Sequence, residues 1–133
     1  MEDLIYKEES YKIIGICFDV HNNLGPGFLE IVYKDALEYE FRKAGIPYSR
    51  ETKYEANYKN VILPHKFYAD FVVYDKIILE AKAVSGIADE FVAQAINYLK
   101  VSNNKLVLIV NFGELRLNSK RIVLESKLQD WKK

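Results

Sequence analysis

Apolar residues recur at helical spacing in the first third of the chain. Between residues 10 and 24 they return every three or four positions, which predicts a helix with Ser10 as its N-cap. The segment Gly25-Pro26-Gly27 interrupts this pattern, and a second apolar stripe predicts a helix over residues 28–44 that ends at Gly45. The chain is therefore expected to begin with two consecutive helices joined by a tight turn.

The pattern changes to that of strands beyond Pro47. Loose alternation and short apolar runs predict five strands, at residues 48–58, 66–74, 77–84, 105–112 and 115–124. Residues 88–101 return to helical spacing, and this helix would cross over between the third and fourth strands. The fourth strand is the most hydrophobic, so we expect both of its faces to be covered. The order α-α-β-β-β-α-β-β predicts an α/β fold with a mixed central β-sheet flanked by helices.

Length and composition indicate one globular domain. The 133 residues fit a single domain with a core over about 10–124, and the Lys-rich end from Lys127 to Lys133 is expected to fray. Half of the residues are hydrophobic and 29% are charged, which excludes a mainly disordered chain. The single cysteine, Cys17, cannot form an internal disulfide and is expected in the core.

The location and the partners are less closely defined by the sequence. The acidic N-terminus lacks the apolar stretch of a signal peptide, and no apolar run reaches the ~20 residues of a membrane span, so a cytoplasmic protein without membrane contact is expected. Basic and acidic residues number 19 each, which counts mildly against a nucleic-acid partner but is compatible with a local basic rim. The oligomeric state, including a homodimer, stays open.

Three charged residues interrupt the apolar strands. Asp70 lies in the predicted second strand, and Glu80 and Lys82 lie two positions apart in the third, on one face of the sheet. Charges at such positions are costly unless they are paired or bind a metal ion. Carboxylates suit Mg²⁺ or Mn²⁺, and a nearby ammonium can orient water or stabilise phosphate charge. The alternative is a solvent-facing salt bridge, which is the commoner origin of an isolated Glu-x-Lys.

The connection between these two strands decides whether the charges meet. A two-residue turn at Asp75-Lys76 would pair Asp70 with Ala81 and place Asp70 on the opposite face from Glu80. A three-residue connection, Tyr74-Asp75-Lys76, or a bulge pairs Asp70 with Glu80. We predict the second arrangement.

These residues resemble a known family. The run from His21 to Tyr33 is similar to the signature of the GxxExxY protein family, here Gly27, Glu30 and Tyr33. Later blocks are similar as well, and the resemblance covers roughly residues 10 to 124. These blocks are Tyr68-Ala69-Asp70-Phe71, Leu79-Glu80-Ala81-Lys82-Ala83-Val84, and Gln94 with Tyr98.

The resemblance implies a role for each of these residues. The family is grouped with the PD-(D/E)XK nuclease superfamily, so a restriction-endonuclease-like fold and a metal-dependent nuclease acting on DNA or RNA are expected. Asp70 and Glu80 would bind Mg²⁺ or Mn²⁺, and Lys82 would be the catalytic lysine. The Ala81 carbonyl and, through water, Glu30 would complete the metal site, and Gln94 and Tyr98 would support catalysis. One departure is Ala69, which stands where the superfamily's name has proline.

The same residues also have simpler interpretations. Glu30 is favoured by the helix dipole at the start of its helix. Tyr33 is equally compatible with a core position, and Gln94 and Tyr98, four apart on one helix face, with packing. His21 is more often structural than a neighbour of a metal. Candidate phosphate contacts lie among the tyrosines of residues 48–76, which offer stacking surfaces, although a solvated strand face has the same composition. These contacts are Arg50, Lys53, Lys59, Lys66 and Lys76.

Three hypotheses follow for the function. The first is a nuclease, and the second is an inactive module on the same fold that binds nucleic acid or protein. The third is a structural protein in which Asp70, Glu80 and Lys82 form a buried ion network.

Overall fold

The computed structural model describes residues 4–124, so the fraying predicted for Lys127–Lys133 lies outside the described residues. The expected order of helices and strands is confirmed. The helices are α1 (Lys7–Leu24), α2 (Glu30–Ala44) and α3 (Asp89–Ser102). The strands are β1 (Tyr48–Tyr58), β2 (Val61–Val73), β3 (Ile77–Lys82), β4 (Leu106–Asn111) and β5 (Asn118–Ile122).

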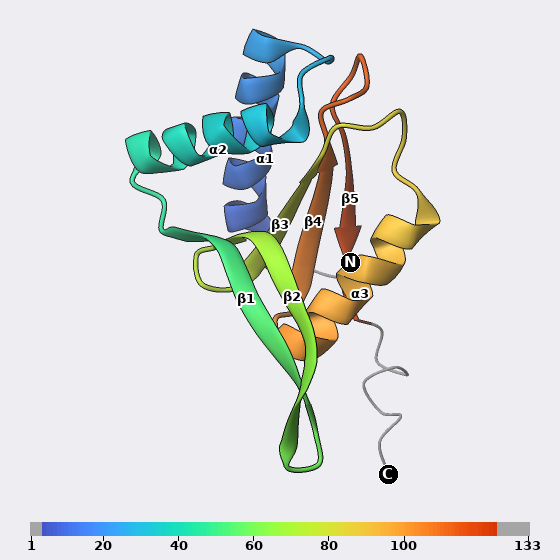
Figure 1. The fold of residues 1–133 in the computed structure, drawn as a ribbon. Helices are drawn as coiled ribbons and strands as arrows, with labels where there is room; N and C mark the ends of the chain where they lie inside the picture. The colour runs from blue at the N-terminus through green and yellow to red at the C-terminus, as the bar shows by residue number, and fades with distance from the viewer. Residues whose placement is uncertain (1–3, 125–133) are drawn as a thin grey trace.

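The strands form one mixed sheet in the order β1-β2-β3-β4-β5 (Figure 1). Neighbouring strands are antiparallel except β3 and β4, which are parallel. A parallel pair needs a crossover connection, and α3 supplies it as the sequence predicts.

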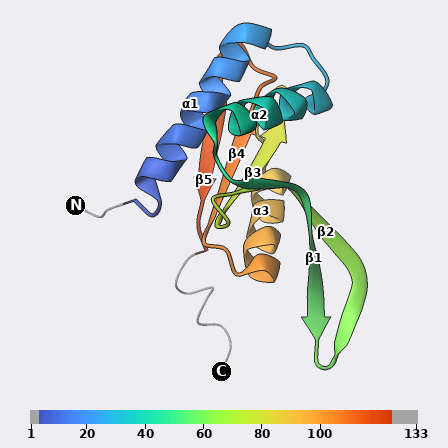
Figure 2. The same cartoon turned by 90° about the vertical axis from the view of Figure 1, so that its left-hand side faces the viewer.

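Helices cover both faces of the sheet (Figures 1 and 2). On one face, α1 and α2 bury Cys17 and Phe41 against alternate residues of β3 and β4 such as Leu79 and Leu108. On the other face, α3 packs on the intervening residues. All six residues of β4 are buried, so the strand is covered on both faces, as predicted.

The hairpin of β1 and β2 extends beyond the body of the protein (Figure 2). The second strand begins at Val61 rather than near residue 66, because the apolar residues Val61 and Ile62 pair with the end of β1 although both stay exposed. A register shift between Glu55 and Asn57 interrupts the pairing of the two strands. The outer hairpin is therefore a solvated ribbon, whereas its inner part belongs to the core.

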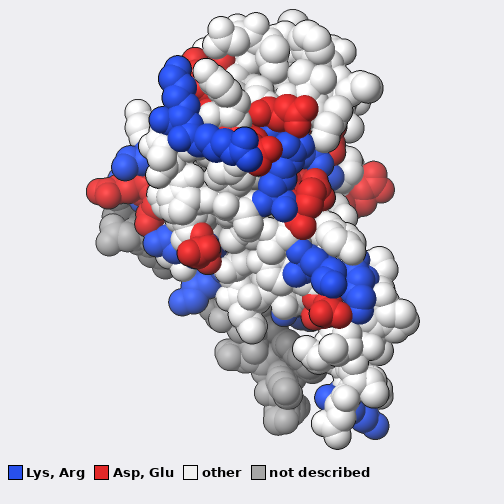
Figure 3. All heavy atoms as spheres, turned by 60° about the vertical axis from the view of Figure 1, so that its left-hand side comes forward, with Lys and Arg blue, Asp and Glu red and all other residues white. Residues whose placement is uncertain are grey.

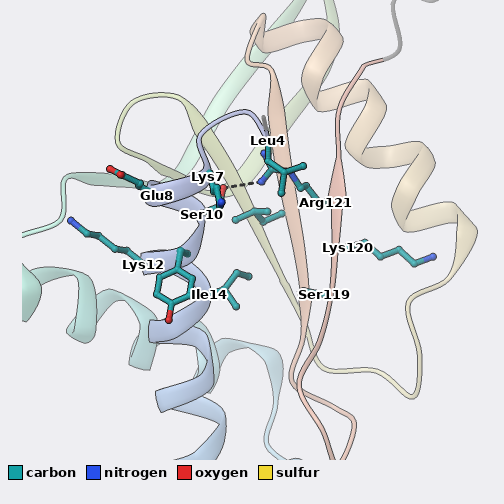
Figure 4. Close-up of a pocket in the computed structure, with 11 residues that line it drawn as sticks. Leu4, Lys7, Glu8, Ser10, Lys12, Ile14, Ser119, Lys120 and Arg121 are labelled. Atoms are coloured by element: carbon teal, nitrogen blue, oxygen red, sulfur yellow. Dashed lines mark hydrogen bonds between the residues drawn. The ribbon is translucent and has the colours of Figure 1, made fainter. Parts of the chain in front are cut away.

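The prediction that Ser10 caps the first helix is wrong. The helix starts earlier, at Lys7, and Ser10 lies buried in its second turn. The Ser10 hydroxyl accepts a hydrogen bond from Arg121 of β5 (Figure 4). This arginine also donates to the Ile5 carbonyl. The helix N-terminus is thus tied to the edge strand instead of being capped by its own serine. Across residues 4–124, no helix is both long and apolar enough to cross a membrane.

Candidate metal and phosphodiester site

The strands β2 and β3 separate at Asp70 and Glu80. Backbone pairing runs from Val73 opposite Ile77 to Phe71 opposite Leu79 and goes no further. The connection is the three-residue one: Tyr74 and Asp75 have φ values of 56° and 59°, and the Lys76 amide donates to the Val73 carbonyl. Two successive residues with positive φ resemble a type I′ turn, and Lys76 adds one further residue before the pairing with Ile77 begins. The register predicted from the sequence is therefore confirmed.

Where the backbones of β2 and β3 separate, two carboxylates take over the hydrogen bonding between the strands. The Asp70 amide donates to Glu80 Oε2 at 2.8 Å, and the Ala81 amide donates to Asp70 Oδ2 at 2.9 Å. Both acidic residues are buried, with exposed fractions of 7% and 4%. In this place, which we call the fork, each strand's amide is satisfied by the other strand's carboxylate instead of a carbonyl. The structure thus brings Asp70 and Glu80 together.

A lysine that sequence reasoning missed also lies in the fork. Lys34 of α2 places its Nζ 2.9 Å from Asp70 Oδ1, 3.2 Å from Glu51 Oε1 and 3.8 Å from Glu30 Oε2. Its side chain is only 12% exposed. The one sequence signal is its spacing four residues after Glu30, which puts the two side chains on one helix face.

The backbone opposite Asp70 is strained. Glu51 of β1 has φ of 52°, in the left-handed region that residues other than glycine, asparagine and aspartate rarely adopt. This distortion falls in β1 between Arg50 and Thr52, the partners of the two neighbours of Asp70. The Glu51 carboxylate meets Lys34, so the fork is held by contacts from α2 and from β1.

Lys82 lies on the same sheet face as Glu80, as predicted from their spacing. Glu80 lies opposite Ile109 in the parallel pair, on the face that α3 covers. The Lys82 Nζ lies 4.6 Å from the centre of the Phe91 ring, a cation–π contact that brings the ammonium beside α3. The Lys82 charge lowers the pKa of Glu80 and of Glu30, although other causes outweigh it in both.

The electrostatic balance of the fork favours an added cation. Burial, and after it the nearby Asp70 charge, raises the pKa of Glu80 to about 8. The same two causes raise the pKa of Glu30. Burial alone would lower the pKa of Lys34, but its hydrogen bond to Asp70 and the surrounding charges raise it. The carboxyl groups of Glu80 and Glu30 resist ionisation, and the Lys34 ammonium keeps its proton more firmly than usual. Both shifts indicate a negative electrostatic potential at the fork.

Tyr98 and Gln94 occupy one face of α3 but make different contacts. The buried Tyr98 donates its hydroxyl to the Tyr68 carbonyl at 2.9 Å, two residues before Asp70. Burial and the charge of Glu80 raise the pKa of this hydroxyl. Gln94 is exposed and lines a groove beside Tyr68. The structure therefore connects Tyr98 to the backbone that carries Asp70, and it places Gln94 next to the site instead of in it.

The residues of the first motif shape the turn between α1 and α2. Tyr33 is fully buried, stacks on Phe112 with ring centres 4.8 Å apart, and donates its hydroxyl to the Gly25 carbonyl. His21 is buried and its Nε2 lies 2.8 Å from the Glu114 carbonyl. Both side chains thus pack in the core near this turn. The turn in this way sets the start of α2, the helix from which Lys34 reaches the fork.

Most of the candidate phosphate contacts are already paired. Arg50 binds Asp35 and Glu38, Lys66 binds Glu55, and Lys76 binds Glu9. Lys59 lies over the Tyr58 ring near the hairpin tip, and Lys53 is exposed. Figure 3 shows the same feature over a wide face, where blue Lys and Arg side chains alternate with red Asp and Glu.

The donor set of the fork fits a hard divalent cation. Mg²⁺ is commonly bound by one or two carboxylates together with water and phosphate oxygens. Asp70 and Glu80 supply the carboxylates, and the Ala81 amide that bonds Asp70 shows that this part of β3 faces the fork. Within residues 4–124, no group of three or more His, Cys, Asp or Glu side chains is close enough to hold a metal ion. A bound metal would therefore need oxygen ligands beyond the side chains of residues 4–124.

Comparison with known proteins defines the class of this protein. The chain belongs to the PD-(D/E)XK nuclease superfamily, which it matches over residues 7–122. Proteins of this superfamily typically use a divalent metal ion. The solved structure described as the crystal structure of SSO0001 is similar in fold, with a TM-score of 0.53 and 18% sequence identity over 72% of this chain. This chain spans 51% of that structure's length, and no match was found among curated proteins.

Proposed function

We propose that this protein is a metal-dependent nuclease that hydrolyses phosphodiester bonds in DNA or RNA, and that it is of the GxxExxY type within its superfamily. The observation that carries the proposal is the meeting of Asp70 and Glu80 at the fork, with Lys82 on the same face as Glu80. Superfamily membership supports the reaction class.

Each residue of the fork has a role in this proposal. Asp70 and Glu80 would hold Mg²⁺ or Mn²⁺ together with the Ala81 carbonyl and, through water, Glu30. When bound, the ion supplies a Lewis acid for the phosphate and lowers the pKa of a bound water. Lys82 orients the attacking water and stabilises charge on the phosphate oxygens.

Other residues hold these groups in position. The Ala81 amide orients Asp70 through its Oδ2, whereas Lys34 pairs with Oδ1 in the metal-free protein. Tyr98 anchors the β2 backbone just before Asp70 through the Tyr68 carbonyl. Gln94, on the rim, is assigned to substrate contact. Such support matters because small displacements of reacting groups strongly reduce rates.

The test is cleavage of a panel of DNA and RNA substrates with Mg²⁺ or Mn²⁺ and with EDTA. Wild type is expected to cut only with metal, and Asp70→Asn, Glu80→Gln and Lys82→Met are each expected to lower the rate at least about a hundredfold. Lys12→Met, a change at an exposed lysine of α1, is the control and should leave the rate unchanged. A wild-type protein that cuts no substrate with either metal contradicts the proposal.

A second candidate is a binding module without catalytic activity. The observation that favours it is the ion pair of Lys34 with Asp70, because an ammonium at this place satisfies the carboxylate without a metal. The zero net charge is also compatible with it. Binding of nucleic acid that persists in EDTA, without cleavage and without a thermal shift on adding metal, would select this candidate.

A further inference from the structure

A groove of about 680 Å³ lies between β2 and α3, beside the fork. Its walls include Tyr68 and Phe67 from the strand and Phe91 and Gln94 from the helix. Its volume is in the range of pockets that hold small organic ligands. Neither the superfamily match nor the roles proposed above assign an occupant to the groove as a whole.

The groove is continuous with the proposed site. Tyr68 stands two residues before Asp70, and its carbonyl accepts the Tyr98 hydroxyl. Phe91, on the opposite wall, carries the Lys82 ammonium over its ring at 4.6 Å. A ligand that fills the groove would therefore lie next to the residues proposed to act on a phosphodiester bond.

Aromatic rings give the groove flat surfaces. His65 is exposed and Phe67 is half-buried on the strand wall, whereas the Tyr68 ring lies on the opposite face of the strand. His65 and Phe67 meet edge to face with ring centres 4.7 Å apart, and Phe67 meets Tyr98 in the same way at 6.2 Å. Stacking of a nucleobase on such a ring contributes about 1–3 kcal/mol.

Amide side chains stand at the opposite wall. Gln94 and Asn97 are exposed on α3 and line the groove. Carboxamides can donate and accept hydrogen bonds at the edge of a base. Rings for stacking and amides for base edges are the groups that recognise unpaired nucleotides.

The charges of this region argue against a duplex. Lys66, the basic residue in the groove wall, is paired with Glu55 at 2.8 Å, and Glu90 adds a negative charge to the wall. A protein that tracks a duplex backbone neutralises many phosphates with basic side chains. In a duplex, moreover, the bases are stacked on each other and unavailable to the aromatic rings. The groove therefore suits exposed bases better than paired ones.

We propose that this groove binds unpaired nucleotides next to the scissile phosphate, so that the substrate of the site is single-stranded nucleic acid or a single-stranded region of a larger one. The inference rests on the proposed function and specifies its substrate class. His65 and Phe67 form the stacking surface, and Gln94 contacts the edge of a base.

The experiment measures binding in EDTA, which separates it from cleavage. Fluorescence anisotropy compares a mixed-sequence single strand, as DNA and as RNA, with the matched duplex. We expect tighter binding of one or both single strands than of the duplex, with a shallow salt dependence because few phosphates are neutralised. His65→Ala should weaken single-strand binding about tenfold, whereas His65→Phe should retain it.

Controls separate this inference from the nuclease proposal. Tyr39→Ala changes a tyrosine of α2 that is 65% exposed and remote from the groove, and it should leave binding unchanged. Asp70→Asn should bind single strands as well as wild type even if cleavage is lost. Duplex binding as tight as single-strand binding, or wild-type affinity of a folded His65→Ala variant, overturns the groove assignment whether or not the protein cleaves.

Discussion

The fork and the corner after β4 both bury polar side chains, but they satisfy them in opposite ways. At the corner, the side-chain oxygen of the fully buried Asn111 accepts hydrogen bonds from the backbone amides of Val84 and Gly113, at 3.0 Å each. Its side-chain nitrogen donates to the Val84 carbonyl at 2.9 Å and to Glu114 Oε2 at 2.7 Å. The oxygen and nitrogen of the Asn111 side chain thus each have two partners, and most of these partners are backbone groups.

At the fork the buried groups are carboxylates rather than an amide. Asp70 and Glu80 lie close enough that burial and mutual repulsion raise the pKa of Glu80, even with Lys34 and Lys82 nearby. A neutral amide with four hydrogen bonds stabilises a fold, whereas neighbouring buried carboxylates are costly unless something positive compensates them. The difference is consistent with a structural corner and supports the proposal that the fork binds a cation.

The largest expected effect concerns Glu80 and pH. Burial raises the pKa of Glu80 to about 8, so the folded protein keeps this proton up to that pH, whereas the unfolded chain releases it near its usual 4.5. Stability is therefore full below about pH 4.5 and falls as the pH rises through about 8. Glu80→Gln cannot ionise and should be more stable than wild type by about 4 kcal/mol near pH 8, at about 1.4 kcal/mol per unit of pKa. Urea unfolding at pH 5 and pH 8 measures the difference.

Metal addition sharpens this test of the fork. Saturating Mg²⁺ favours the ionised Glu80 and should restore the stability that wild type loses as the pH rises from about 4.5 to about 8. The Gln variant should gain little from Mg²⁺ at any pH. Equal slopes of stability against pH in wild type and variant would show that Glu80 titrates normally and would remove the electrostatic argument for the fork.

The next largest effect concerns Asn111 at the corner after β4. Asn111→Ala leaves the amides of Val84 and Gly113 and the Val84 carbonyl without their partner, and each unsatisfied buried group costs about 1–3 kcal/mol. We expect a loss of about 3 kcal/mol in the free energy of unfolding, measured in urea.

Metal binding by this variant distinguishes the two clusters. The folded fraction of Asn111→Ala should bind Mn²⁺ with wild-type affinity, because the corner holds no proposed ligand. Asp70→Asn is the matched change at the fork: it keeps an acceptor for the Ala81 amide and should lose metal binding with a smaller change in stability. Loss of metal affinity in Asn111→Ala instead would mean that the two clusters are coupled.

The order of elements and the register of the fork could be predicted from the sequence. The apolar runs of residues 66–74 and 77–84 set the strands, and the three-residue connection Tyr74-Asp75-Lys76 places Asp70 opposite Glu80. Spacing alone left two registers, because the side-chain period of a strand is two and one residue in the connection decides the face. The three-residue register was predicted because it brings the charged side chains together.

Other features depended on packing that spacing does not encode. Lys34 reaches the fork only because α2 packs close to Asp70 of β2. No sequence pattern within the helix reveals this packing. The pairing of Arg50 with Asp35 and Glu38 likewise requires the arrangement of α2 against β1. Ser10 looked like a helix cap because its partner Arg121 lies 111 residues later in the chain.

The smallest effect concerns Lys34, whose ammonium stands beside Asp70 where a divalent cation would also be attracted. Lys34→Met keeps the apolar stem of the side chain and removes the charge that lies 2.9 Å from Asp70 Oδ1. The variant should bind Mn²⁺ about tenfold more tightly, a difference of about 1.4 kcal/mol, because the ion no longer competes with the ammonium. Isothermal titration calorimetry in the absence of nucleic acid measures this affinity.

The control is Lys76→Met, which removes an ammonium 2.7 Å from Glu9 on another part of the surface and should not change Mn²⁺ affinity. If Lys34 instead helps to organise the metal site, the Lys34 variant should bind Mn²⁺ more weakly, and the fork would then need its lysine as a ligand-positioning group. Unchanged affinity would mean that Lys34 moves away from Asp70 at no cost when the ion enters. Only tighter binding of Mn²⁺ supports the view that the Lys34 ammonium occupies the place of the cation in the metal-free protein. The corner cluster around Asn111 needs no such cation.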